Sequence, residues 1–164
     1  MCPVSGRRPW GRGHYYELHT NGWSQGWINI GLGINRTRLN NDDPATLLAR
    51  APYSTVRRMV EDGADFLEIL RGPSSLGGLL EEAGYHVVPS PNIPAPGDCC
   101  FFFAGWNTWA HGSRHGGTID ATHIETHFQY INAGHSKRRQ YSLDLADAII
   151  TFMHSHYDDL ALCP

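Results

Sequence analysis

The sequence predicts an α/β protein with a mixed, largely parallel sheet flanked by helices, and three observations favour that fold. At 164 residues the chain has the length of one domain. Its 41% apolar and 18% charged residues are typical of a globular protein with a real core. Stretches with strand and helix periods alternate in the order strand, helix, helix, strand, strand, strand, helix.

The chain begins with a polar arm and a short aromatic strand. Residues 1–13 are rich in Gly, Arg and Pro, which predicts an irregular arm ahead of a single domain over residues 14–164. The stretch HYYELH that follows is a strand candidate, with Tyr15, Glu17 and His19 on one face. The next stretch, NGWSQGWINIGLGIN, predicts a glycine-rich loop followed by a second short strand.

Capping and helix-breaking residues mark the ends of the helical regions that follow. Asp and Pro are typical of a helix N-terminus, Ser of a cap, and Gly of a break or a C-terminal stop. Asp43 and Pro44 are expected to start a helix over 45–51, which Pro52 ends. Gly63 is expected to break the helical region over 54–70. Ser74 is expected to cap the next helix, and Gly84 to end it.

The second half of the chain predicts three strands and a long helix. Residues 85–88 form a strand candidate that leads into a proline-rich connector. The apolar run CCFFFA (99–104) predicts a central strand that is covered on both faces. A glycine-rich loop over 105–117 precedes the strand in GGTIDATHIETHFQY (116–130), and Ser136 is expected to cap the last long helix, which runs to about Tyr157.

Composition excludes several classes of partner. The net charge is −3 and basic runs are short, which argues against nucleic acid. No apolar run approaches the ~18 residues of a membrane span. No signal-peptide core is visible, so the expectation is cytoplasmic by default, or secreted if a leader was removed. The four cysteines, Cys2, Cys99, Cys100 and Cys163, resemble no zinc knuckle, and thiols and disulfides both stay open.

The strand after the glycine-rich loop carries the clearest chemical motif. His123, Glu125 and His127 share one face because side chains alternate along a strand. Two imidazoles around one carboxylate suit metal ligands, a proton relay or a general base. The alternative for the two histidines is packing or surface exposure beside hydrogen-bond partners. For Glu125 function is favoured, because a carboxylate inside an apolar strand is costly unless it is paired.

Two further groups are candidate substrate contacts. Asn107, Ser113 and Arg114 lie in the predicted glycine-rich loop, where they would line a pocket, unless that loop is only a backbone turn. Arg138 and Arg139 near the start of the last helix are candidates for gripping a substrate carboxylate. Ordinary solvated arginines on a helix surface are the alternative.

Three ordered stretches resemble a known family. They are LRGPSSLGGLLEEAGYHVVPSPNIPAPG, FFFAGWNTWAHGSRHGGTIDATHIETHF and RRQYSLDLADAIITFMHSHYD. Over about residues 14–158 the chain resembles the C-terminal half of the N-formylglutamate amidohydrolase-like family, which is similar in fold and site to zinc carboxypeptidases and aspartoacylases. The resemblance implies a shortened phosphorylase/hydrolase-like fold and zinc-dependent hydrolysis of an amide bond adjacent to a carboxylate. The substrate would then be a small carboxylate-containing amide or peptide.

The same resemblance implies roles for individual residues. His19, in the run Glu17-Leu18-His19, would be a zinc ligand, and Glu125 would be the general base. His123 and His127 would support the metal. No His-x-x-Glu pair, which gives two ligands in that family, precedes Glu17. Either a second chain supplies ligands, or His123, Glu125 and His127 form a substitute site together with His19 or with the loop histidines His111 and His115.

A protein of another class is the alternative. The chain would then be a non-catalytic binding or structural protein on the same fold that has lost its metal site and assembles with itself. A sheet without its first strands would expose an edge, and an exposed edge invites pairing with another copy of the chain. The sequence therefore predicts either a zinc enzyme or a homo-oligomer joined through that edge.

Overall fold

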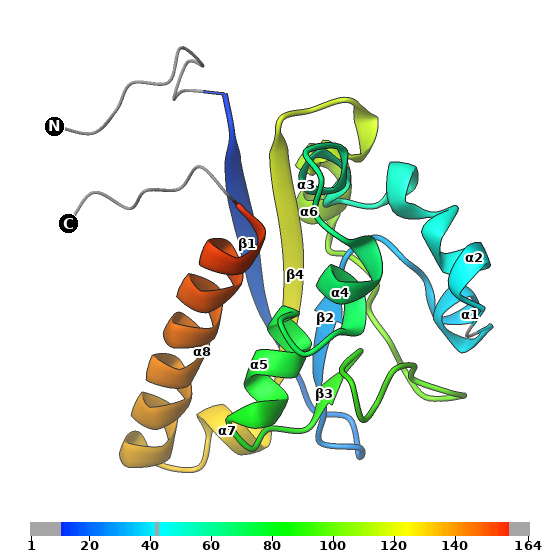
Figure 1. Cartoon of the computed structure of the whole chain (residues 1–164). Coiled ribbons are helices and arrows are strands. Elements are labelled where there is room, and N and C mark those ends of the chain that lie inside the picture. The colour runs from blue at the N-terminus through cyan, green and yellow to red at the C-terminus, as the bar shows by residue number, and fades with distance from the viewer. Residues whose placement is uncertain (1–10, 42, 158–164) are drawn as a thin grey trace, which may run out of the picture.

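A four-stranded mixed sheet forms the centre of the protein in the computed structural model, which describes residues 11–41 and 43–157 (Figure 1). The strand order is β1 (Gly13–Asn21), β4 (Ile119–His127), β2 (Ile28–Gly31) and β3 (Val87–Val88). β1 runs parallel to β4 and β3 parallel to β2, whereas β2 and β4 are antiparallel. The predicted mixed α/β fold is confirmed, with a sheet that is only partly parallel.

Short helices and one long helix pack around this sheet. α5 (Leu76–Glu82) and α8 (His135–His156) cover one face, and α6 (Trp106–His111) lies over the other, beside β1 and β4. The helices are α1 (Arg36–Asn40), α2 (Pro44–Leu48), α3 (Arg57–Glu61), α4 (Phe66–Arg71), α5 (Leu76–Glu82), α6 (Trp106–His111), α7 (Phe128–Ile131) and α8 (His135–His156), with 3-10 turns at Ala51–Tyr53 and Ser113–His115. None of these helices combines the length and apolar composition that crossing a membrane would need.

The predicted helix boundaries hold in part. Asp43 caps α2 by accepting a hydrogen bond from the backbone N–H of Thr46, and Gly63, at φ +111°, separates α3 from α4. Ser75 rather than Ser74 caps α5. The Ser74 hydroxyl is instead bonded to Glu68. Ser136 is also wrong as a cap, because the cap of α8 is Gly134 and Ser136 lies inside the helix.

The apolar run over 99–104 is not a strand, contrary to its prediction. Its backbone passes over β2 at Gly31, where an added Cβ would lie 2.7 Å from the carbonyl oxygen of Phe103. The run therefore covers a face of the sheet, and β4 is the strand that is buried on both sides. The predicted loop over 105–117 contains α6. The predicted arm lies largely outside the described residues, and Gly13 already belongs to β1.

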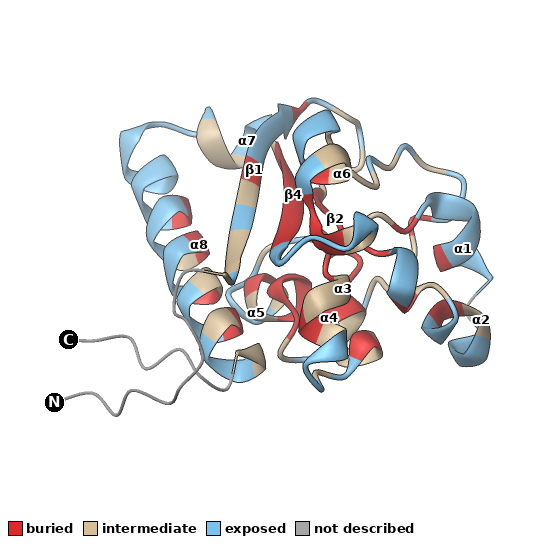
Figure 2. Ribbon diagram, turned by 90° about the horizontal axis from the view of Figure 1, so that it is seen from above, coloured by how far each residue is buried: buried red, intermediate tan, exposed pale blue. Residues whose placement is uncertain are grey.

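The core lies between the sheet and helices α4, α5 and α8 (Figure 2). Buried residues concentrate on β4, β2 and the inward sides of α4, α5 and α8. Ile28, Ile124 and Phe152 are among the side chains that are almost wholly removed from water. Burial of this kind provides most of the stability of a domain of this size. It also leaves the opposite face of the sheet free for polar groups.

A half-buried histidine lies beside this core. His14 hydrogen bonds to the hydroxyl of Thr122 at 2.8 Å and to that of Tyr157 at 3.0 Å. The Tyr157 hydroxyl in turn donates to Asp120 at 2.9 Å. Burial lowers the pKa of His14 from 6.5 to about 3. His14 therefore stays neutral in the folded protein at pH values where it is protonated in the unfolded chain.

This difference makes stability depend on pH. In the unfolded chain His14 takes up a proton below pH 6.5, whereas in the folded protein it takes one up only below pH about 3. The free energy of unfolding therefore falls as the pH drops through that range. We expect His14 to account for a loss of about 1.4 kcal/mol between about pH 7.5 and about pH 5.5. Urea unfolding of the wild type and His14→Gln at both pH values measures it. The exposed-site control His135→Gln should keep the wild-type slope, and an unchanged slope in His14→Gln would contradict the assignment.

Candidate metal centre

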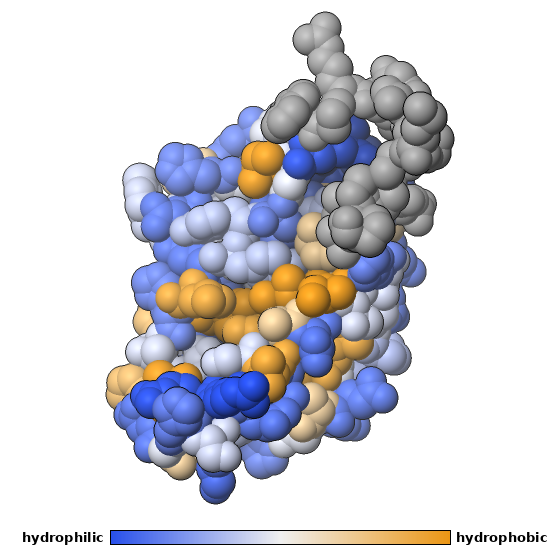
Figure 3. Space-filling view, turned by 90° about the vertical axis from the view of Figure 1, so that its left-hand side faces the viewer, coloured by the Kyte–Doolittle hydropathy of each residue, from blue (hydrophilic) through white to orange (hydrophobic). Residues whose placement is uncertain are grey.

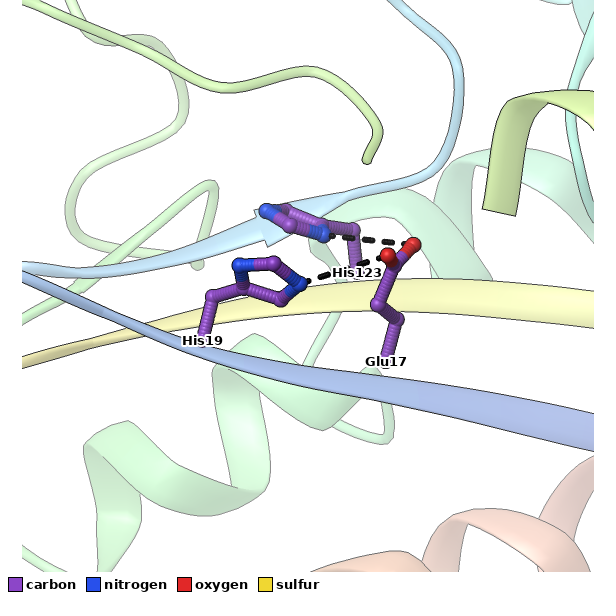
Figure 4. A group of neighbouring side chains, drawn as sticks. All are labelled: Glu17, His19 and His123. Atoms are coloured by element: carbon purple, nitrogen blue, oxygen red, sulfur yellow. Dashed lines mark hydrogen bonds and ion pairs between the residues drawn. The ribbon is translucent and has the colours of Figure 1, made fainter. Parts of the chain in front are cut away.

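Two imidazoles and a carboxylate converge on the face of the sheet that α6 covers (Figure 4). The register pairs Glu17 of β1 with His123 of β4, and His19 with Glu125. Paired residues of neighbouring strands point to the same face, so all four side chains gather there. One ligand atom from each of Glu17, His19 and His123 lies within 4.8 Å of the other two.

The spacing of these atoms fits a metal ion. Nε2 of His19 is 3.3 Å from one carboxylate oxygen of Glu17, and Nδ1 of His123 is 3.7 Å from the other. Two ligand atoms bound tetrahedrally to one zinc ion are about 3.3 Å apart, given bonds of about 2.0–2.1 Å. Two histidines and one glutamate also form a ligand set found in catalytic zinc sites. The three side chains therefore match zinc in ligand type, and the two distances between histidine and glutamate lie near the tetrahedral value.

Glu17 is held in place and kept ionised by the start of α6. Its carboxylate accepts hydrogen bonds from the backbone N–H of Thr108 at 2.9 Å, from the Thr108 hydroxyl at 2.6 Å and from the Asn107 amide at 3.1 Å. Burial opposes ionisation, but these bonds and the attraction of His123 outweigh it and lower the pKa of Glu17 to about 2. The buried carboxylate is therefore negative at neutral pH, as a metal ligand must be.

His123 is oriented by Glu125. The Nε2 atom of His123 lies 3.0 Å from Oε1 of Glu125, and a proton on Nε2 lets it donate that hydrogen bond. The lone pair of Nδ1 is then free to bind a metal, and Nδ1 makes no hydrogen bond in the structure. A carboxylate that holds the far nitrogen of a histidine is the usual support for a metal ligand.

Buried polar atoms without partners gather on the same face. Among the described residues, Oε2 of Glu125 and both amide atoms of Asn29 are buried and make no hydrogen bond within the protein. Asn29 of β2 is paired with Glu125 of β4, so the two side chains are neighbours. Most buried polar atoms in proteins have a partner. This group therefore has the character of a surface that faces a ligand or ordered water.

Gly105, the residue before α6, leaves room for this cluster. A Cβ at that position would lie 2.7 Å from Nδ1 of His123 and closer still to Oε2 of Glu17. The Glu17 carboxylate cannot move away easily, because Thr108 holds it through two hydrogen bonds. The glycine is therefore needed for space, since its φ of −76° is open to any residue.

We expect Gly105→Ala to weaken zinc binding by roughly 10- to 100-fold, the range that follows when the support of a ligand is disturbed. A competition titration against a chelator gives the dissociation constant. Gly11→Ala is the matched control, because an added Cβ there meets no atom within 4 Å. Equal zinc affinity in the two variants would show that the methyl group does not reach the cluster.

The structure brings some of the predicted site residues together and separates others. His19, His123 and Glu125 lie at the cluster, and Asn107 contacts it through Glu17. His127 lies at the end of β4, where its Nδ1 atom accepts a hydrogen bond from the backbone of Gln129 at 3.1 Å and begins α7. It does not belong to the three-residue group.

The other predicted contacts lie away from the cluster. Ser113 donates to Asp120 at 2.6 Å, and the guanidinium of Arg114 stacks over Trp109, 3.2 Å from the ring centre. Arg138 and Arg139 are exposed at the start of α8, which covers the opposite face of the sheet. These residues make no contact with the cluster among the contacts that the described residues show, and their roles in binding substrate stay predictions.

Two residues of the site were missed from the sequence. Glu17 was placed on the same face as His19, and its spacing, Glu-x-His, mirrors the His-x-Glu of residues 123–125. That symmetry was a usable signal for Glu17. Asn29 offered none, because a single amide between isoleucines marks no chemistry until the strand is placed beside Glu125.

Comparison of the chain with protein-family models, with curated proteins and with solved structures finds no match. The implied family and its activity therefore rest on the resemblance of the sequence motifs, and the site rests on its own geometry.

Proposed function

We propose that this protein is a metal-dependent hydrolase that cleaves an amide bond adjacent to a carboxylate, on a shortened phosphorylase/hydrolase-like fold. The observation that carries the proposal is the convergence of Glu17, His19 and His123 with a free carboxylate oxygen of Glu125 beside them. Zinc fits these ligands better than a hard cation such as Mg²⁺, which prefers oxygen ligands alone.

Each residue has a role in this reaction. Glu17, His19 and His123 would hold the ion, which when bound would lower the pKa of a coordinated water to about 7. Glu125 would take the proton from the attacking water, because its Oε2 atom is free while Oε1 keeps its bond to His123. Asn29 would donate its amide to a substrate oxygen, since that amide has no hydrogen-bond partner among the described residues.

Access to the cluster is from the edge of the sheet. The side chain of His19 is 50% exposed, whereas those of Glu17 and His123 are nearly buried. A small substrate would therefore approach the cluster from the side of His19. The family resemblance implies that the substrate carries a carboxylate. Arg138 and Arg139 are the residues that the sequence predicts to bind it.

Zinc content and turnover test this proposal together. Protein purified without chelator, then incubated with zinc and desalted, should carry about one zinc ion per chain by mass spectrometry of metals. It should then release formate from N-formylglutamate or acetate from an N-acetylated acidic amino acid. A zinc content near zero after loading would remove the proposal, and full loading without turnover would leave only a metal-binding protein.

A second candidate function is a structural one, in which copies of the chain associate with each other. The observation in its favour is that β1 lies at the end of the strand order β1-β4-β2-β3.

A further inference from the structure

Two exposed aromatic side chains lie beside the metal cluster. Phe102 belongs to the segment that crosses the sheet on the cluster's face, and its ring centre is 6.3 Å from that of His123, with the rings nearly perpendicular. Phe102 is nevertheless 47% exposed. Trp106, the first residue of α6, is 76% exposed and directly precedes the two residues that bind Glu17. Aromatic side chains of this kind commonly line ligand sites.

The position of Phe102 is fixed by its own segment and by a neighbouring ring. The backbone N–H of Gly33 donates a hydrogen bond to the carbonyl of Phe103 at 2.8 Å. The segment also lies so close to β2 that a Cβ at Gly31 would meet its backbone at 2.7 Å. The Phe102 ring stacks on Trp23, with ring centres 4.9 Å apart. The ring is therefore held beside the cluster before a ligand binds, which lowers the entropic cost of binding.

The ring of Trp23 is supported from the same strands that carry the cluster. Trp23 lies in the connection between β1 and β2, and its backbone N–H donates to Oδ1 of Asn21 at 3.3 Å. The amide of Asn21, which is buried at the end of β1, donates to the backbone carbonyl of Glu125 at 2.9 Å. Phe102 and Trp23, called the aromatic pair below, therefore have a fixed relation to the metal cluster.

The arginines predicted to bind a substrate carboxylate lie away from the cluster. The guanidinium of Arg114 stacks over Trp109, and Arg138 and Arg139 belong to α8 on the other face of the sheet. The side chain of an acidic amino acid would therefore meet the carboxylates of the cluster without one of these arginines to neutralise it. Because an unpaired carboxylate is costly to remove from water, an uncharged side chain suits this site better.

We propose that the aromatic pair binds the side chain of the substrate, which is an N-acylated aromatic amino acid. This inference rests on the proposed function, which brings the amide bond of the substrate to the metal cluster. The side chain of the same amino acid is then within reach of Phe102, whose ring contacts a proposed metal ligand. Aromatic rings attract each other edge to face or stacked, with centres about 4.5–7 Å apart. Phe102 offers part of its surface to such a ring, because it is half exposed.

A separate apolar surface lies on the other side of β1. It is a groove between β1 and α8 to which Leu18 and Ile149 contribute. Figure 3 shows the side of the molecule that carries these two elements, with apolar residues gathered into a band across it. Because side chains alternate along a strand, Leu18 and Glu17 point to opposite faces of the sheet. Leu18 therefore provides an exposed apolar control that faces away from the cluster.

Binding of two matched ligands tests the aromatic pair. N-formylphenylalanine and N-formylglutamate share the formyl amide and the α-carboxylate and differ only in the side chain. On protein incubated with zinc, a titration followed by ligand-observed NMR should give a dissociation constant roughly 10-fold lower for N-formylphenylalanine. Phe102→Leu stays apolar but loses the ring, so it should lose most of this preference, whereas Phe102→Tyr should keep it. Equal affinity of the wild type for both ligands, or the full preference in a folded Phe102→Leu protein, would overturn the proposal.

Controls and turnover separate this proposal from the hydrolytic one. Leu18→Ala and Tyr53→Ala each remove an exposed side chain outside the aromatic pair, and both should keep the wild-type preference. A thermal melt checks that every variant is folded. The ratio of kcat/KM for the two substrates should follow the ratio of their affinities. A binding preference without turnover of either substrate would support the aromatic pair and remove the hydrolase function. Faster turnover of N-formylglutamate would keep the hydrolase function and overturn the aromatic substrate.

Discussion

Replacing His123 by alanine is expected to abolish tight zinc binding and, with it, amide hydrolysis. The side chain of His123 is only 2% exposed and lies between the carboxylates of Glu17 and Glu125. Its loss leaves two protein ligands, of which His19 is half exposed. We expect zinc affinity to fall by more than the roughly 100-fold that marks the upper range for loss of a supporting group. A chelator competition titration measures this fall.

The control for this variant is a histidine outside the cluster. His135 is exposed at the start of α8, and His135→Ala should bind zinc as the wild type does. The buried alanine also removes a hydrogen-bond donor from Glu125, so a thermal melt must show that the variant is folded. Wild-type zinc affinity in a folded His123→Ala protein would exclude this histidine as a ligand.

Replacing Glu125 by glutamine is expected to separate metal binding from catalysis. The glutamine keeps an oxygen that accepts a hydrogen bond from Nε2 of His123, so the orientation of that ring is preserved. It cannot take a proton from water. We expect zinc content to stay near that of the wild type while kcat falls by roughly 100- to 10,000-fold, the usual contribution of a general base.

Two other outcomes have clear meanings for this variant. If Glu125 only orients His123, Glu125→Gln will retain both zinc and most of the activity. If the carboxylate itself binds the metal, zinc affinity will fall together with kcat. Glu82→Gln, on the exposed side of α5 and away from the cluster, is a matched control for the loss of one carboxylate charge.

The sequence predicts the local elements of this fold where strand alternation or a single capping or helix-breaking residue is clear. The alternation around His14–His19 and His123–His127 predicted β1 and β4, and Asp43 and Gly63 predicted helix boundaries. The prediction of a strand over 99–104 was wrong, because an apolar run has the same composition in a central strand and in a segment that crosses over a sheet.

For the candidate site too, the sequence predicted what lies within one strand and not what depends on contacts between elements. The sequence aligned His123 with Glu125 and His127, since a strand fixes which side chains share a face. It could not exclude His127, whose ring is used at the start of α7, or include Asn29 from another strand. The placement of Arg138 and Arg139 on the far side of the sheet was equally hidden, because it depends on which face α8 covers.

By itself the sequence determined a mixed α/β chain with two strands rich in His and Glu, because strand alternation and capping act within a few residues. Only the tertiary structure decided that Glu17 lies beside His123, that α6 fixes Glu17 as an anion, and that β1 is the outermost strand of the sheet that the described residues form. Those facts depend on strand order and register, which are set by contacts between residues about a hundred positions apart in the chain.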